Sequence, residues 1–164
     1  MINTQSKIFE NLPPALEVIH QWQAAGDKIV FTNGCFDILH LGHVDHLEKA
    51  RHLGNKLVLG LNTDSSICRL KGPERPLQDE MSRARVMASL LFVDMVILFS
   101  EDTPYELIAA IKPDILVKGD DYAIENIVGH DIVQKNGGIV KTITLVQGYS
   151  TTRIIEKIKK QIKS

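Results

Sequence analysis

The chain has 164 residues, of which 44% are hydrophobic and 24% are charged, and its formal net charge at pH 7 is −1. These values are typical of one globular domain and argue against a disordered, collagen-like or coiled-coil chain. The near-neutral charge and the aromatic content of only 5% also argue against a general nucleic-acid binder, which would be more basic and richer in stacking side chains.

Short apolar runs alternate with helical patterns along the chain. Strands are predicted at residues 28–33, 56–62, 94–99, 114–118 and 139–145. Helices are predicted near residues 13–25, 44–53, 78–92, 104–111, 124–133 and 154–162. Because the strands are short and mostly apolar, as in sheets covered on both faces, the alternation predicts an α/β fold with a parallel sheet. We expect a single domain over residues 1–164, with residues 1–26 as an N-terminal helical extension.

Ligands of such sheets bind beyond the carboxyl ends of the strands. The segments in that position are expected to be loops, at residues 33–43, 62–76, 99–104, 118–124 and 146–152. The search for chemistry therefore starts with these five segments.

The first of these loops has the composition of a phosphate site. Gly34 and Gly42 would let backbone approach a ligand closely, and the loop opens a helix whose free N–H groups suit phosphate. His40 and His43 are three residues apart, so both can face one bound group. The alternative is that each histidine is only a helix cap or a surface residue. The dinucleotide fingerprint G-x-G-x-x-G and the P-loop motif are both absent.

These residues carry a family resemblance. The stretch 34–43 resembles the G-x-F-D-x-x-H-x-G-H signature of the cytidylyltransferase-like nucleotidyltransferases, and the stretch 148–153 is similar to their G-I-S-T-[ST] run. Ser150 and Thr151 can donate hydroxyls to phosphate and Arg153 adds charge, although plain helix caps are the alternative. The resemblance implies a Rossmann-like three-layer sandwich with a five-stranded parallel sheet.

Two further segments resemble one branch of this superfamily. The stretch 69–77, with two prolines and a glycine that predict a loop, is similar to the K-G-x-x-R-P-L segment of D-glycero-β-D-manno-heptose 1-phosphate adenylyltransferases. The stretch 117–122 is similar to their V-K-G-x-D-Y. A solvated run of charge is the alternative for the first stretch. The resemblance covers about residues 28–158. Because no kinase-sized segment is present, it implies the stand-alone form of the C-terminal half of ADP-heptose synthase.

The sequence departs from the related glycerol-3-phosphate cytidylyltransferases at two places. Those enzymes carry R-T-E-G-I-S-T and R-Y-V-D, where this chain has Leu145–Thr151 and Leu91–Asp94. Both departures favour the heptose enzymes and leave the roles of Gln147 and Tyr149 open.

The resemblance implies transfer of AMP from ATP to a heptose 1-phosphate, giving ADP-heptose and pyrophosphate for lipopolysaccharide or surface-glycan precursors. Mg²⁺ would be bound mainly through the nucleotide phosphates, without metal ligands from the protein. One alternative is a CTP-dependent cytidylyltransferase acting on glycerol 3-phosphate or a similar alcohol phosphate. Another is a non-catalytic nucleotide-binding regulatory module. The expected partners are ATP and a sugar 1-phosphate, with a homodimer left open.

The resemblance also implies residue roles. Catalytic roles are expected for His40, His43 and Lys71. Nucleotide contacts are expected from Thr32, Asn33, Gly34, Phe36, Asp37, Gly42, Lys118, Gly119, Asp120, Ser150, Thr151 and Arg153. Acceptor contacts are expected from Arg75, Asp121 and Tyr122.

Several of these roles have alternatives. Asp37 could be a buried orienting group or part of an Asx turn. Asp120 and Asp121 could bind sugar hydroxyls, bind Mg²⁺ through water, or belong to a solvated loop. Arg83 matches an arginine that is widespread in the superfamily, with a surface salt bridge as the alternative.

A zinc site and a nucleophilic cysteine are the rival chemistries. His40, His43 and His46 are spaced by three residues, but successive steps of three rotate around a helix, so we expect His46 to point away. Cys35 is expected to be a small packed residue.

The remaining expectations concern cellular location and the packing of the first helix. The chain has only two cysteines, which is typical of a cytoplasmic protein. It has no basic region followed by an apolar run at its start and no long apolar stretch, so we expect neither a secretory signal nor a membrane span. Its charge and aromatic content, given above, predict no nucleic-acid partner. On the first helix, Leu12, Leu16 and Ile19 are expected to pack either on a partner or on the core.

Overall fold

The computed structural model describes residues 3–162 and contains one six-stranded parallel sheet. Its strands lie in the order β1-β4-β3-β2-β5-β6, and every neighbouring pair is parallel. The strands are β1 (Ile8–Phe9), β2 (Ile29–Gly34), β3 (Lys56–Asn62), β4 (Met95–Phe99), β5 (Ile115–Gly119) and β6 (Ile139–Ile143). The chain order reverses at β2, which places the crevice for a ligand beyond the carboxyl end of that strand.

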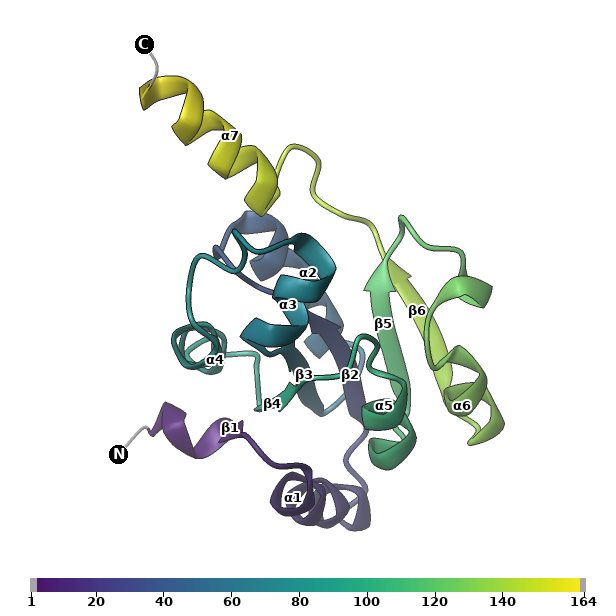
Figure 1. The fold of residues 1–164 in the computed structure, drawn as a ribbon. Coiled ribbons are helices and arrows are strands. Elements are labelled where there is room, and N and C mark those ends of the chain that lie inside the picture. The colour runs from purple at the N-terminus through teal and green to yellow at the C-terminus, as the bar shows by residue number, and fades with distance from the viewer. Residues whose placement is uncertain (1–2, 163–164) are drawn as a thin grey trace.

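Helices cover both faces of the sheet, which gives the expected three layers (Figure 1). One face packs on α2 (Leu41–Arg51) and α4 (Glu80–Ala88), and the other on α1 (Leu12–Ala24), α5 (Tyr105–Ile111) and α6 (His130–Lys135). The remaining helices are α3 (Asp64–Lys71), α7 (Thr151–Ile162) and the short 3₁₀ turns η1 (Thr4–Lys7) and η2 (Ile124–Asn126). The Rossmann-like α/β prediction is confirmed.

Alternating side chains of β2 pack into the hydrophobic cores on the two faces of the sheet. Val30 belongs to the cluster under α2 and α4, whereas Ile29 and Phe31 belong to the cluster under α1, α5 and α6. All three side chains are fully buried. A strand buried on both faces reads as a continuous apolar run, which is why the sequence located it.

The N-terminal segment contributes a strand as well as a helix. The two residues of β1 pair with Val96 and Ile97 of β4, so the sheet gains a sixth strand beyond the five expected. Two residues are too short a run for periodicity to detect. On α1, Ile19 is buried, and Leu12 and Leu16 pack against the core, which resolves the open choice for these residues in favour of the core.

The predicted loop over residues 62–76 was wrong for residues 64–71, which form α3. Thr63 caps this helix, because its side chain accepts a hydrogen bond from the Ser66 N–H, and Asp64 in the first turn complements the helix dipole. Gly72, with a φ of 97°, ends the helix. The prolines and glycine that suggested a loop all lie after α3.

The last helix has an unusual place in the fold. Figure 1 shows α7 in yellow, projecting from the rest of the molecule at the end of a long connection from β6. None of its described side chains is buried. Within residues 3–162, no helix is long and apolar enough to cross a membrane.

Candidate active site

A cleft of about 640 Å³ lies beyond the carboxyl ends of β2, β3 and β5. Its lining residues are Thr32, Asn33, Gly34, Cys35, Phe36, Gly42, His43, His46, Asn62, Leu70, Lys71, Lys118, Gly119, Asp121, Tyr122, Leu145 and Ser150. The cleft therefore brings together residues from the four motif segments, which are separated by more than a hundred positions in the chain. It has the place in the fold where parallel sheets bind ligands.

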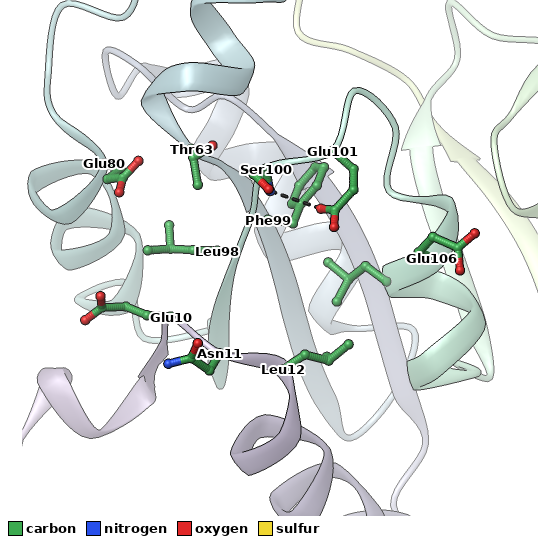
Figure 2. Close-up of a pocket in the computed structure, with 11 residues that line it drawn as sticks. Glu10, Asn11, Leu12, Thr63, Glu80, Leu98, Phe99, Ser100, Glu101 and Glu106 are labelled. Atoms are coloured by element: carbon green, nitrogen blue, oxygen red, sulfur yellow. Dashed lines mark hydrogen bonds between the residues drawn. The ribbon is translucent and has the colours of Figure 1, made fainter.

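A second pocket, of about 390 Å³, differs from the cleft in charge. It lies near the ends of β1 and β4, and Figure 2 shows Glu10, Glu80, Glu101 and Glu106 around it. Of these carboxylates, Glu80 accepts from the Asp64 N–H and Glu101 from the Ser100 N–H. An acidic lining repels phosphate, so the cleft is the better candidate for an anionic ligand.

The start of α2 forms one wall of the cleft. His40 is the N-cap residue of α2, with an extended backbone, and its side chain makes no capping hydrogen bond. Its ring instead stacks on the His43 ring, with centroids 3.7 Å apart and an interplanar angle of 24°. Phe36 also packs on the His43 ring, with centroids 4.9 Å apart and an interplanar angle of 57°. A Cβ at Gly42 would lie 3.1 Å from the His40 ring, so glycine makes room for this stack.

Burial favours the neutral form of both stacked histidines. Burial, followed by the nearby His40 and His46, lowers the pKa of His43 to about 4, and burial also lowers the pKa of His40. The Nδ1 atoms of His40 and His43 are buried without a hydrogen-bond partner among the described residues. His43 lines the cleft, whereas His40 is not among the lining residues and adjoins the cleft through its stack on His43.

The low histidine pKa values predict a pH-dependent stability. The pKa of His46, like that of His43, is lowered to about 4, first by burial and then by Lys118. Below an unfolded-state pKa of 6.5, the unfolded chain binds protons that the folded chain does not, so stability falls as the pH drops from about 6.5 towards 4. We expect the free energy of unfolding to decrease by about 2 kcal/mol for each of these two histidines between pH 7 and pH 5.

Urea unfolding of the wild type and of the double variant His43→Asn/His46→Asn at several pH values measures this effect. The double variant is expected to lose most of the pH dependence, while His52→Asn, at an exposed position just after the same helix, keeps it. Equal pH dependence in the wild type and the double variant would contradict the prediction.

Two lysines reach the cleft from opposite sides of β2. Lys71 ends α3 and lies on the side of β3, whereas Lys118 lies on β5. Lys118 Nζ donates to the Asn33 carbonyl oxygen at 3.3 Å, and burial lowers the pKa of Lys118 to about 8. Lys118 is thus a largely desolvated cation in the wall of the cleft, where an anionic ligand is attracted more strongly than in water.

Asp37 and Arg75 form a clamp beside the cleft and do not line it. The fully buried Asp37 side chain accepts from Arg75 Nε at 2.7 Å and from the backbone N–H groups of Leu77 and Gln78 at 2.9 and 3.0 Å. Burial alone would raise the pKa of Asp37, but these donors outweigh it and lower that pKa. Asp37 therefore orients the loop after α3 through backbone hydrogen bonds, as its interpretation as a buried orienting group predicts and unlike a simple Asx turn.

The remaining predicted residues divide between the cleft and its surroundings. Ser150 lines the cleft and its Oγ accepts from the Arg153 N–H, so it is both a helix cap and a site residue. Thr151 and Arg153 lie in the first turn of α7, outside the lining. Asp120 is exposed, and its Oδ1 accepts from the Leu145 N–H, whereas Asp121 and Tyr122 line the cleft.

His46 was wrongly expected to point away. It lines the cleft, and its Nε2 lies 3.2 Å from the Thr32 hydroxyl oxygen. A step of three residues turns the helix by only about 60° short of a full turn, so a wide cleft can contact both His43 and His46. The three-residue spacing of His43 and His46 was the feature of the sequence that could have predicted this position. Within the described part of the chain, no three His, Cys, Asp or Glu side chains are grouped to hold a metal ion.

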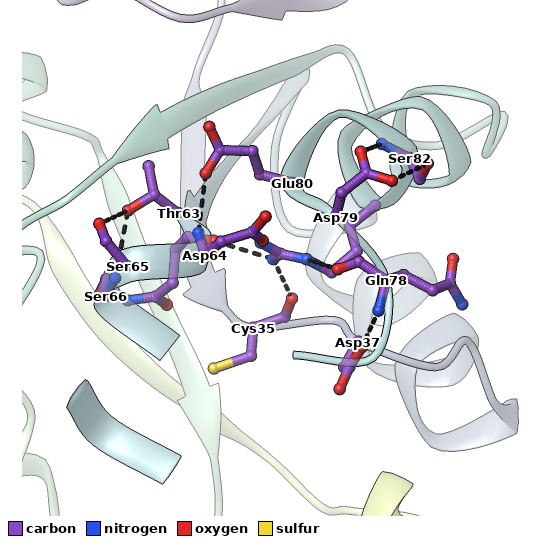
Figure 3. A network of polar contacts seen from close by, with 12 residues as sticks. Cys35, Asp37, Thr63, Asp64, Ser65, Ser66, Gln78, Asp79, Glu80 and Ser82 are labelled. Carbon is purple, nitrogen blue, oxygen red and sulfur yellow. Dashed lines mark hydrogen bonds and ion pairs between the residues drawn. The ribbon is translucent and has the colours of Figure 1, made fainter. Parts of the chain in front are cut away.

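Arg83 is buried next to the cleft loop, and its ion pair with the partly exposed Asp64 is one of several contacts that it makes there. It is 1% exposed and donates to the backbone oxygens of Cys35, Asn62 and Gln78 and to Asp64 Oδ1, at 2.7 to 3.0 Å. Figure 3 shows Cys35, Asp64 and Gln78 around this network. One guanidinium thereby ties the loop after β2, the end of β3 and the start of α4 to each other.

The comparisons with known proteins agree with this geometry. Residues 31–157 match the family model described as cytidylyltransferase-like. The chain is 57% identical over 157 residues to the bifunctional protein HldE of Magnetococcus marinus, and 54% identical over 156 residues to that of Syntrophotalea carbinolica. The matches cover 96% and 95% of this chain but 32% and 31% of those proteins, so the chain spans about a third of their length.

A solved structure is also similar. The lipopolysaccharide core biosynthesis protein from Thermoplasma volcanium GSS1 is 33% identical, with a TM-score of 0.60, and the match covers 76% of this chain and 100% of that one. The cleft at the carboxyl ends of the parallel strands, the H-x-G-H loop and these similarities agree. The chain belongs to the cytidylyltransferase-like family.

Proposed function

We propose that the protein is a nucleotidyltransferase that transfers AMP from ATP to the phosphate of a heptose 1-phosphate, releasing pyrophosphate. The observation that carries the proposal is the cleft in which the start of α2, Lys71, Lys118 and Ser150 converge on one space. The identity to HldE proteins and the heptose-type motifs around Lys71 and Lys118 support the acceptor. The similarity to a lipopolysaccharide core biosynthesis protein supports a role of ADP-heptose in surface glycans.

In this reaction an oxygen of the acceptor phosphate attacks the α-phosphorus of ATP. The bond from that phosphorus to the oxygen bridging the α- and β-phosphates breaks, and pyrophosphate leaves with the electron pair. The acceptor phosphate is already an anion, so the step needs no general base and no covalent intermediate. The protein has to align the reactants and offset the charge that develops on the phosphates.

The start of α2 provides the central phosphate contacts in this proposal. His40 and His43 would donate from Nε2 to the α- and β-phosphate oxygens, alongside the backbone N–H groups of the helix terminus. Gly42, which has no side chain, leaves room for the His40 ring. Thr32, Asn33, Gly34 and Phe36, at the end of β2 and in the loop after it, would line the nucleotide beneath these histidines.

The two ends of the cleft would hold the outer phosphates and the acceptor. Lys71 would bridge the nucleotide and acceptor phosphates, and Ser150, Thr151 and Arg153 would hold the β- and γ-phosphates at the start of α7. Lys118, Gly119 and Asp120 would contact the nucleotide, and Asp121, Tyr122 and Arg75 the acceptor. Because the described residues provide no group of metal ligands, we propose that Mg²⁺ enters as the ATP complex and spreads the phosphate charge.

A grid of nucleotides and phosphorylated acceptors tests the proposal. Pyrophosphate release is expected with ATP and heptose 1-phosphate, and not with CTP and glycerol 3-phosphate. Turnover with CTP in place of ATP would replace the proposal by a cytidylyltransferase. Binding of ATP, measured by calorimetry, without pyrophosphate release from any pair would instead indicate a regulatory binding module.

A further inference from the structure

The helix α7 has an amphipathic pattern that the fold leaves uncovered. Ile154, Ile155, Ile158 and Ile162 repeat at helical spacing, yet Ile158 and Ile162 are 48% and 79% exposed and no described residue of α7 is buried. A helix of 12 residues is marginal in water unless its apolar face packs on something. Figure 1 shows that α7 projects from the sheet layers and is joined to them through the connection from β6.

The groove beside α7 faces the loop that follows α3. A space of about 510 Å³ separates the two, lined by Lys71, Glu74, Arg75 and Leu77 on the loop side and by Thr152, Ile155, Glu156 and Lys159 on the helix side. Leu77 is 56% exposed in this groove, opposite Ile155. The two walls therefore each present one apolar side chain to the same solvent-filled space.

Charges on the two walls are complementary. The loop side carries the carboxylate of Glu74 and the cations Lys71 and Arg75, and the helix side carries the carboxylate of Glu156 and the ammonium of Lys159. No ion pair found within residues 3–162 joins the two walls. Opposite charges on two facing surfaces attract each other and disfavour partners with the wrong charge pattern.

Both walls connect directly to the nucleotide cleft. Lys71 lines the cleft as well as the groove, and Ser150, next to the first residue of α7, lines the cleft. A Cβ at Gly42 would lie 3.5 Å from the Cβ of Tyr149, so the start of α7 already lies beside the start of α2. A triphosphate bound by the N-termini of both α2 and α7 would therefore fix the position of the N-terminus of α7.

We propose that α7 is a lid that closes onto the loop of residues 71–77 when a nucleoside triphosphate binds. Closure packs Ile155 on Leu77, pairs Lys159 with Glu74 and brings Glu156 towards Arg75. It shuts the groove behind Lys71 and so excludes water from the phosphate end of the cleft. The inference rests on the proposed function in one respect, that a triphosphate enters the cleft.

Hydrogen exchange with ATP and Mg²⁺, in the absence of any acceptor, tests the lid. The amides of residues 151–162 are expected to exchange at least about tenfold more slowly when ATP is bound. Protection of residues 33–43 reports binding itself. If residues 33–43 become protected and α7 does not, the lid is refuted while nucleotide binding stands; if neither changes, the proposed function fails first.

Charge reversal separates docking from a simple effect on helix stability. Glu74→Lys and Lys159→Glu are each expected to abolish most of the ATP-dependent protection of α7, and the double variant Glu74→Lys/Lys159→Glu is expected to restore it. Lys157→Glu makes the same charge change on the far side of α7 and is expected to keep full protection. Loss of protection in the double variant as large as in the single variants would overturn the pairing.

A second copy of the chain is the competing occupant of the same helix face. Exchange at two protein concentrations, together with sedimentation, distinguishes the two. Protection of α7 that rises with protein concentration and is independent of ATP would overturn the lid in favour of a dimer. Protection that depends on ATP alone, with a constant sedimentation coefficient, supports closure.

Discussion

Replacing His43 by alanine is expected to reduce kcat by about 10²–10³-fold, on the scale found when one donor to a developing oxyanion is removed. His43 lies in the wall of the cleft, stacked on His40 and packed on Phe36. The loss should fall on kcat more than on KM, because the charge that His43 offsets develops in the transition state. Pyrophosphate release at saturating ATP and heptose 1-phosphate measures it.

The matched control is His52→Ala, an exposed histidine that immediately follows α2. This variant is expected to turn over like the wild type, and circular dichroism should show both variants to be folded at the assay temperature. Normal turnover by a folded His43→Ala protein would refute the assignment of the phosphate site to the start of α2.

Arg83→Met is expected to lower the free energy of unfolding by about 3–5 kcal/mol, the range for removing one partner of a buried ionic network. The methionine would fill much of the space but donate nothing to the oxygens of Cys35, Asn62 and Gln78. A buried carbonyl that loses its donor has no hydrogen bond to compensate for its desolvation, and this penalty lowers the stability of the folded state. Because one of these carbonyls belongs to the cleft loop, activity should fall together with stability.

Urea unfolding of Arg83→Met beside Arg85→Met measures this effect. Arg85 lies on the same helix at an exposed position, so its replacement is expected to change stability by no more than about 0.5 kcal/mol. Equal losses in the two variants would show that the buried network contributes nothing specific.

Local sequence patterns predicted many of the residues that line the cleft. The loop over residues 34–43 was located because a glycine-flanked histidine pair follows a buried strand, and that signal lies within one short segment. Residues of the other motifs were placed in the cleft because the carboxyl ends of parallel strands share one edge of the sheet. The α/β architecture was predictable for the same reason, since strands buried on both faces are continuous apolar runs.

Other features depended on contacts that no local pattern encodes. The role of Asp37 depends on Arg75, Leu77 and Gln78, which lie about forty residues away in the chain. The charge of Arg83 suggested the surface, and only the carbonyls converging around it make its burial favourable. The helix α3 was hidden by the prolines and glycine that follow it, although Thr63 and Asp64 carry an N-terminal capping pattern.

The sequence by itself determined the parallel α/β class, the positions of the main strands and the place of the candidate site loop after the first long strand. These properties follow from hydrophobic periodicity and from residue chemistry within short segments. Only the tertiary structure decided which charges are buried and paired, that His46 faces the cleft, and that α7 faces the loop after α3 across an open groove. The physical reason is that burial and pairing depend on distances between segments, which the chain sets only when the sheet brings their ends together.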